Sequence, residues 1–260
     1  MRKSVILCLL AAFAVQPAIA ETAEEKGLRI ATAADKRDSG WGDMTANMKM
    51  ILKNRAGNTS VRTIRTKTLE VSGDGDKSLS LFDDPADVKG TAMLTFSHGL
   101  KPDDQWLYLP AIKRVKRISS KNKSGPFMGS EFAFEDLGSQ EIEKYSYRYL
   151  AEESCGSGWK CHKIERTPAY KYSGYTRQVS WVDQSDYQLR KVEFYDRRGD
   201  LLKVLELSDY RNYEGIWRAH KLSMSNVQTN KQTDLIYGDY TFNTGLAEND
   251  FVKVLLSLLR

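Results

Sequence analysis

The sequence lacks the long apolar runs of membrane-spanning proteins and the motifs of common enzymes. Its apolar run at residues 5–15 is shorter than the roughly 20 residues that a membrane-spanning helix requires. No G-x-S-x-G, P-loop, H-E-x-x-H or G-x-G-x-x-G motif occurs, and the three histidines are scattered along the chain. The sequence therefore offers no catalytic residue, and we expect no enzymatic activity and no cofactor.

The first 20 residues have the three parts of a secretory signal peptide. Residues 1–3 include two basic side chains, an apolar run follows, and residues 18–20 form a small-residue cleavage site. Cleavage after Ala20 leaves 37 of the 39 basic side chains against 34 acidic ones. This mild charge gives no reason to expect a nucleic-acid partner. We expect residues 21–260 to form one domain, a monomer in the periplasm.

Cysteine is also scarce. Of three cysteines, only Cys155 and Cys161 follow the signal peptide, and they bracket a glycine-rich turn. An even pair in an exported chain is typical of a disulfide. The alternative is a metal or redox pair, but His162 is the only further ligand nearby. We therefore predict a disulfide and no metal site.

The mature sequence alternates apolar and polar residues, as half-buried strands do. Residues 21–38 favour an amphipathic helix, with Leu28 and Ile30 among its apolar contacts. Residues 44–53 are the clearest strand, and residues 248–259 fit either a short helix or a last strand. Turn residues separate further strand-like runs at 61–71, 77–82, 90–98, 105–109, 112–118, 142–150, 160–167, 175–183, 188–195, 201–210, 216–227 and 232–242. This pattern predicts one β-meander that curls into a barrel or sandwich.

Residues 103–118 are an unusual stretch in which an aromatic strand ends at Pro110 and a strand rich in Lys and Arg follows. Its basic residues stand at positions 113, 114, 116 and 117, so they fall on both faces of the second strand. One interpretation is an edge strand protected by charge. The other is a site that contacts an anionic headgroup or an acidic partner.

Residues 121–137 form the second unusual stretch. This segment carries Phe127, Met128, Phe132 and Phe134 between glycine-containing ends. Large, adaptable apolar side chains on such a loop suit a lid over a hydrophobic cavity. A loop that its aromatic side chains hold against the core is the alternative, and composition does not choose between them.

These two stretches resemble the LolA-like outer membrane lipoprotein-sorting protein family. The resemblance rests on residues 106–111, the basic run that ends at Ile118, and residues 127–132 and 135–137, and it extends from about Trp41 to Phe242. It implies a mainly β (α+β) fold, a curved antiparallel half-barrel of about 11 strands whose concave face is covered by helices and a lid loop. Acyl chains would bind in an apolar hollow that the protein's own side chains leave unfilled, because exposing them costs ~0.8 kcal/mol per CH₂.

We predict a ligand site from strand alternation and from this resemblance. Strand alternation supports Met48, Met50 and Leu52 best. The full set of predicted cavity and lid residues is Met48, Met50, Leu52, Leu94, Phe96, Trp106, Tyr108, Phe127, Met128 and Phe132. Arg114, Lys116 and Arg117 would contact an anionic headgroup or a partner at the rim.

The predicted function is a non-enzymatic carrier that shields the acyl chains of a lipid or lipoprotein on the way to the outer membrane. The chain departs from the classical carrier in its length, its disulfide loop and its basic strand, and in this it resembles companions of transporters of the resistance–nodulation–division (RND) type. Its partner would then be such an inner-membrane transporter or an outer-membrane acceptor. The alternative is a lipid-sensing regulator that binds a membrane-anchored signalling partner, because fold alone does not fix function. A hydrolase that uses His98 or Glu131 has little support.

Overall fold

The chain folds into one open antiparallel sheet of thirteen strands. The structure is a computed structural model, and it describes residues 20–99, 101–156 and 158–258. Residues 1–19 of the expected signal peptide lie outside these ranges. The strands are β1 (Asp43–Lys53), β2 (Thr59–Leu69), β3 (Lys77–Asp84), β4 (Ala92–Phe96), β5 (Asp104–Leu109), β6 (Arg114–Ile118), β7 (Tyr145–Ser154), β8 (Lys160–Pro168), β9 (Arg177–Asp183), β10 (Leu189–Tyr195), β11 (Leu201–Tyr213), β12 (Ile216–Asn226) and β13 (Lys231–Phe242).

The mainly β class, the antiparallel sheet and its open form are as predicted, whereas the strand count exceeds the expected 11 or so. Each strand-like run of the sequence forms its own strand, including the two shortest, β4 and β6. β1 shows why the alternation is a good guide. Met48 and Met50 are buried, while Asn47 and Lys49, which alternate with them, are exposed.

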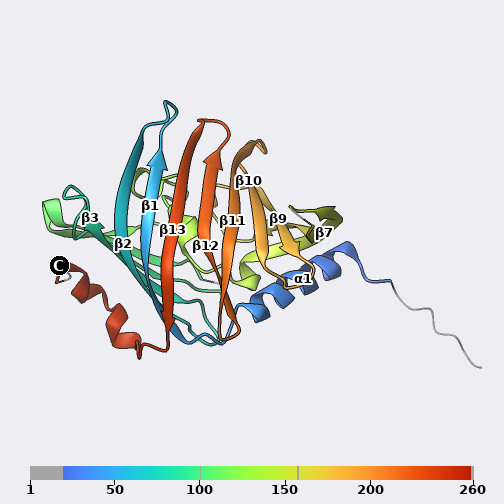
Figure 1. Cartoon of the computed structure of the whole chain (residues 1–260), viewed down its shortest axis with the longest axis horizontal. Helices are drawn as coiled ribbons and strands as arrows, with labels where there is room; N and C mark the ends of the chain where they lie inside the picture. The colour runs from blue at the N-terminus through green and yellow to red at the C-terminus, as the bar shows by residue number, and fades with distance from the viewer. Residues whose placement is uncertain (1–19, 100, 157, 259–260) are drawn as a thin grey trace, which may run out of the picture.

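The strand order explains how the concave side of the sheet is covered. Neighbours in the sheet are neighbours in the chain except where β1 pairs with β13, so the two edges are β6 and β7. These edge strands are consecutive in sequence, and residues 119–141 leave one edge and return to the other through the short turn η4 (Ile142–Lys144). We call residues 119–141 the inner loop. It lies inside the curve of the sheet and carries the short turns η2 (Phe127–Gly129) and η3 (Phe134–Leu137) (Figure 1).

The helix α1 (Ala23–Arg37) begins at Thr22 with a capping box formed with Glu25. Its Ile30 is fully buried against β7 and β8, but Leu28 is 46% exposed, contrary to expectation. Gly27 is required where the helix meets β7, because a Cβ there would lie 2.7 Å from the Arg148 backbone. No helix among the described residues is long and apolar enough to cross a membrane.

The C-terminal residues 246–257, which we call the outer strap, cover the opposite face of the sheet. They form two short turns, η5 (Glu248–Phe251) and η6 (Lys253–Ser257), rather than a helix of several turns or a strand. Phe251 and Leu256 are buried against β3, β4 and β5. In Figure 1 the strap lies outside the curve of the sheet, next to β3.

The predicted disulfide between Cys155 and Cys161 is confirmed, and it closes the hairpin of β7 and β8. The two Cα atoms lie 5.8 Å apart, within the range that a disulfide spans. Cys161 is fully buried beside Val179 and Trp181.

Candidate functional site

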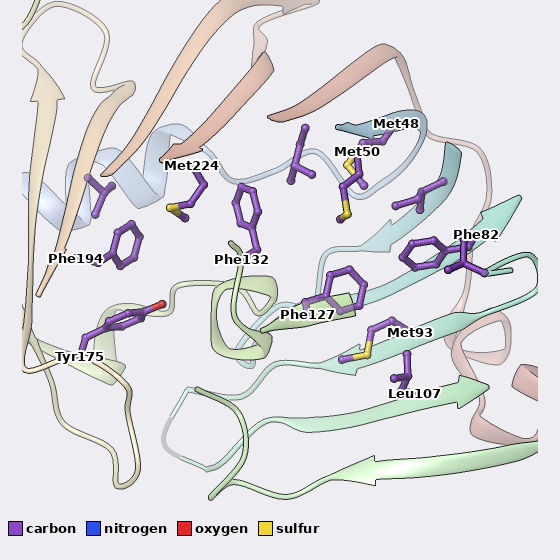
Figure 2. Packing of buried hydrophobic residues seen from close by; sticks show 14 residues of the cluster. Met48, Met50, Phe82, Met93, Leu107, Phe127, Phe132, Tyr175, Phe194 and Met224 are labelled. Carbon is purple, nitrogen blue, oxygen red and sulfur yellow. The ribbon is translucent and has the colours of Figure 1, made fainter. Parts of the chain in front are cut away.

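An apolar floor lies on the concave face of the sheet. Four methionines contribute to it, Met48 and Met50 from β1, Met93 from β4 and Met224 from β12. All four are buried, and Figure 2 shows them around the rings of the inner loop. Other buried members are Ile64, Phe82, Val88, Leu107, Tyr175, Val192, Phe194 and Leu235. Flexible thioether side chains adapt to contacts of changing shape, which suits a surface with more than one occupant.

The inner loop fills the space above this floor. Phe127 is 2% exposed and Phe132 is 4% exposed, and both point from the loop into the apolar cluster (Figure 2). The Phe127 ring lies 5.8 Å from the Phe82 ring and 5.7 Å from the Phe134 ring. One pocket, of about 380 Å³, is lined by residues of α1, β7 and β8. Another, of about 300 Å³, is lined by residues of β1, β2, β3 and β13. No residue of the inner loop lines either of these two pockets. The expected unfilled hollow is thus occupied by the loop's own rings.

A buried ion pair joins the inner loop to the floor. Lys203 on β11 donates to Asp136 Oδ2 at 2.7 Å and to the Glu131 main-chain oxygen at 2.8 Å. The side chains of Lys203 and Asp136 are 4% and 7% exposed. Tyr175 also donates its hydroxyl to Asp136, at 2.8 Å. A buried pair of this kind is satisfied only while the loop is in place.

Glu135 is a second buried acid of the inner loop, and hydrogen-bond donors from the segment between β8 and β9 surround its carboxylate. The Gly174 N–H lies 2.7 Å from its Oε1, and the Ser173 hydroxyl lies 2.9 Å from its Oε2. Burial and the neighbouring Asp136 raise the pKa of Glu135 above its ordinary value. Residue 174 must be glycine, because a Cβ would lie 2.7 Å from the Glu135 carboxylate.

Further hydrogen bonds fix both ends of the loop's aromatic stretch. Arg62 donates to the Met128 main-chain oxygen at 2.5 Å, and Gln105 donates to that of Phe134 at 2.8 Å. Asn226 donates to Glu131 Oε2 at 2.7 Å. In the structure, the aromatic side chains of this segment therefore hold the loop against the core, which is the second of the two interpretations. Polar contacts add to this attachment.

The structure brings some predicted site residues together and separates others. Met48, Met50, Phe127 and Phe132 are buried members of one apolar cluster, and the partly buried Leu52 and Met128 pack against it. The remaining four, Leu94, Phe96, Trp106 and Tyr108, lie on the opposite face beneath the outer strap. The structure therefore does not place these four in a cavity with the inner loop.

Strand alternation explains this separation. β4 and β5 are covered on both faces, by the inner loop on one and by the outer strap on the other. Met93 and Leu107 face the inner loop, and the polar Thr95 and Gln105 lie on the same faces and are buried there as well. Because the polar residues of these two strands stand on the concave face, alternation indicates the opposite face for the cavity. Sequence analysis also missed Lys203, because a lysine alternating with leucines is more often an exposed residue.

The basic residues of β6 lie at the edge of the sheet, as the edge-strand interpretation requires. Arg114, Lys116 and Arg117 are all exposed. Lys116 pairs with Leu107 and shares its face, whereas Arg117 pairs with Trp106, faces the other way and forms an ion pair with Asp104. The three side chains therefore do not form one cluster. Within the described ranges, no group of three metal-ligating side chains is present.

The open curved sheet with a loop across its concave face defines a LolA-like protein. A family model described as an uncharacterized protein matches residues 74–257. A solved structure from Vibrio parahaemolyticus, described as a candidate outer membrane lipoprotein-sorting protein domain, is 56% identical, covers 90% of this chain and 99% of that one, and has a TM-score of 0.88. The chain therefore belongs to the LolA-like outer membrane lipoprotein-sorting protein family.

Two further solved structures share the fold. A DUF1329 family protein from Desulfovibrio piger is 29% identical with a TM-score of 0.85, and it too covers 90% of this chain and 99% of its own. A LolA superfamily protein from Nitrosomonas europaea is 22% identical over the same shares of the two chains, with a TM-score of 0.71. The second likeness shows the fold alone. No curated protein matches the chain.

Proposed function

We propose that this protein is a non-enzymatic periplasmic carrier that shields the acyl chains of a lipid or lipoprotein during transfer toward the outer membrane. The main support is that the methionine-rich floor is covered by a loop with its own aromatic side chains, not by a second sheet or a packed helix. Membership in a lipoprotein-sorting family agrees with this proposal.

In the proposed mechanism, the rings of Phe127 and Phe132 act as a plug that an acyl chain replaces. The inner loop is joined to the sheet at both of its ends, so it swings away from the floor without leaving the molecule. The floor then exchanges one apolar partner for another, which limits the cost of opening. Met48, Met50 and Leu52 would line the bound chain, and Met128 would move with the plug.

We also propose that the edge strand β6 contacts the protein or membrane surface from which cargo is received. Arg114, Lys116 and Arg117 are exposed there and carry positive charge, which favours an anionic surface. An inner-membrane transporter of the RND type is the proposed donor, and an outer-membrane acceptor is the proposed recipient.

The plug can be tested by making it smaller. We expect the full mature chain to bind a fluorescent fatty-acyl probe, and the F127A/F132A variant to bind it about tenfold more tightly, because the probe no longer displaces two rings. Fluorescence titration gives both dissociation constants. The matched control is F251A, which removes a ring of similar burial from the other face and should leave probe affinity unchanged.

Two results would contradict the proposal. In one, neither the original chain nor F127A/F132A binds any acyl probe. In the other, F251A raises probe affinity as much as the plug variant does, which would mean that the probe enters any cavity in the sheet. Circular dichroism of each variant confirms that the sheet has folded.

A further inference from the structure

Lys203 is a buried cation whose oxygen partners all belong to the inner loop. Its side chain is 4% exposed. Its Nζ donates to Asp136 and to the Glu131 main chain, and both acceptors lie within residues 119–141. Outside the inner loop, Lys203 has the rings of Tyr175, in the segment before β9, and of Phe194 on β10, whose centroids are 5.3 and 5.2 Å from Nζ.

This arrangement makes the charge of Lys203 depend on the position of the loop. If the loop moves off the floor, Asp136 and the Glu131 carbonyl leave with it, and Lys203 keeps only its contacts with aromatic rings. A buried charge that loses its partner is destabilised by more than cation–π contacts alone offset. Loop opening is therefore unfavourable unless another anion replaces Asp136.

Lys203 also lies at the end of the apolar floor. On β11 it shares a face with Leu205, and in the sheet Lys203 pairs with Asn226 while Leu205 pairs with Met224. Met224 is fully buried in the floor, and Leu222, two residues before it, pairs with the buried Leu235 of β13. A chain that placed its head at Lys203 would thus have Leu205 and Met224 beneath its first carbons, with Leu222 and Leu235 farther along. In Figure 2, Tyr175, Phe194 and Met224 lie together on one side of the floor.

We infer that Lys203 is the anchor for an anionic headgroup, so that the cargo of this site is an alkyl chain ending in a carboxylate or a phosphate rather than a neutral acyl ester. This inference rests on the proposed carrier function and specifies its ligand. The anion takes the place of Asp136, and the alkyl chain takes the place of the phenylalanine rings. The exposed basic residues of β6 are less suited to this role, because water and salt screen their charges.

The experiment compares three ligands with the same C16 chain, namely hexadecanoate, hexadecyl phosphate and neutral hexadecanol. Each displaces a neutral fluorescent alkyl probe from the full mature chain at pH 8. We expect at least one anionic ligand to bind about tenfold or more tightly than hexadecanol, since charge-assisted hydrogen bonds are worth about 1.5–3 kcal/mol. The order of the two anions identifies which headgroup the site prefers.

Two variants assign the preference to Lys203. K203M should bind all three ligands with similar affinity, and K203M/D136N, which also removes the partner charge, should do the same if K203M alone does not fold. The matched control is K221M, because Lys221 is an exposed lysine on the neighbouring strand β12 and should keep the preference.

The outcomes separate the inference from the function on which it rests. Binding of hexadecanol as tightly as both anions by the original chain, or a preference that survives in K203M or the double variant, would overturn the headgroup inference and leave the carrier function standing. If none of the three ligands displaces the probe or the probe itself does not bind, the carrier function fails and the inference fails with it.

Discussion

The two covers of the sheet differ in how they are held. The outer strap contacts its face mainly through Phe251 and Leu256, which are both 1% exposed in an apolar cluster. The inner loop also buries two phenylalanines, but it adds the Lys203–Asp136 pair and the buried Glu135. The strap also has an ion pair between Glu248 and Lys77 of β3, but the Glu248 side chain is 64% exposed. One cover is thus held mainly by burial of apolar surface with an ion pair at its exposed edge, and the other by apolar burial together with buried, partnered charges.

This difference indicates that the two covers respond differently to a competing ligand. Apolar burial is non-directional and roughly proportional to area, and the strap's ion pair with Lys77 is open to solvent on the Glu248 side, where such a contact contributes little. The inner loop depends on buried charges whose desolvation opposes their attraction. Its docking is therefore a closer balance, which an anion or a change in pH can shift. We expect variants in the strap to affect stability, and variants at the loop to affect both stability and ligand binding.

The largest expected effect is that of F251A in the outer strap. Removal of this buried ring should lower the free energy of unfolding by about 3–5 kcal/mol, because a cavity remains in a packed cluster. Urea denaturation followed by tryptophan fluorescence measures the change. V254A is the matched control in the same strap, since Val254 is 70% exposed and its loss should cost little. Equal stability of F251A and V254A would show that the strap does not contribute to the folded sheet.

The second prediction concerns the charged contact of the inner loop. K203M should lower the free energy of unfolding by about 3 kcal/mol, because it leaves Asp136 buried without its partner. K203M/D136N should recover most of this loss, since no isolated charge remains. If the double variant is as unstable as K203M, the cost comes from lost packing and not from charge, and the distinction between the two covers fails.

The sequence predicts most of the fold because its signals are local. The alternation in β1 and the turn residues between the runs locate all thirteen strands, and the spacing of Cys155 and Cys161 predicts the disulfide. The count of about 11 strands came from the resemblance and not from the runs. The C-terminal residues were ambiguous because they are apolar on several sides, and in the structure they form only short turns.

The candidate site was predicted less well because it depends on which face of each strand is concave. Met48 and Met50 lie in one apolar cluster with Phe127 and Phe132, and the polar residues of β1 mark its outer face. In β4 the polar Thr95 lies on the same face as Met93, so alternation favours Leu94, whereas in the structure Met93 faces the loop. Lys203 depends on a partner 67 residues away, which no local pattern reveals.

The third prediction tests the part of the outer face that the strap does not reach. There Cys161 is buried beside Trp181, and the disulfide closes the end of the β7–β8 hairpin. C155S/C161S should lower the free energy of unfolding by about 2 kcal/mol, because the closed loop is short. Denaturation of the variant and of the original chain with and without reductant measures this. A loss as large as that of F251A would mean that the disulfide, and not the strap, is the main support of this face.

The smallest expected effect is a pH dependence at the end of the inner loop. The Asp76 N–H donates to Ser139 of the loop, at 3.2 Å. Burial, aided by the nearby Glu141 and Glu70 carboxylates, raises the pKa of Asp76 from 3.8 to about 7. Between these two values the folded chain keeps a proton that the unfolded chain has released, so the free energy of unfolding falls as pH rises from about 4 to about 7.

D76N holds a neutral side chain at this position at every pH. Its stability relative to the original chain should therefore increase from pH 4 to pH 8, by on the order of 1 kcal/mol after allowance for partial solvent screening. Urea denaturation at several pH values gives the difference. D74N is the control, for which we expect the opposite change in relative stability with pH. A hydrogen bond with His98 lowers the pKa of Asp74, so the charged form of Asp74 is favourable in the folded chain. Parallel pH curves for D76N and the original chain would show that burial of Asp76 does not make the stability of this end of the loop depend on pH.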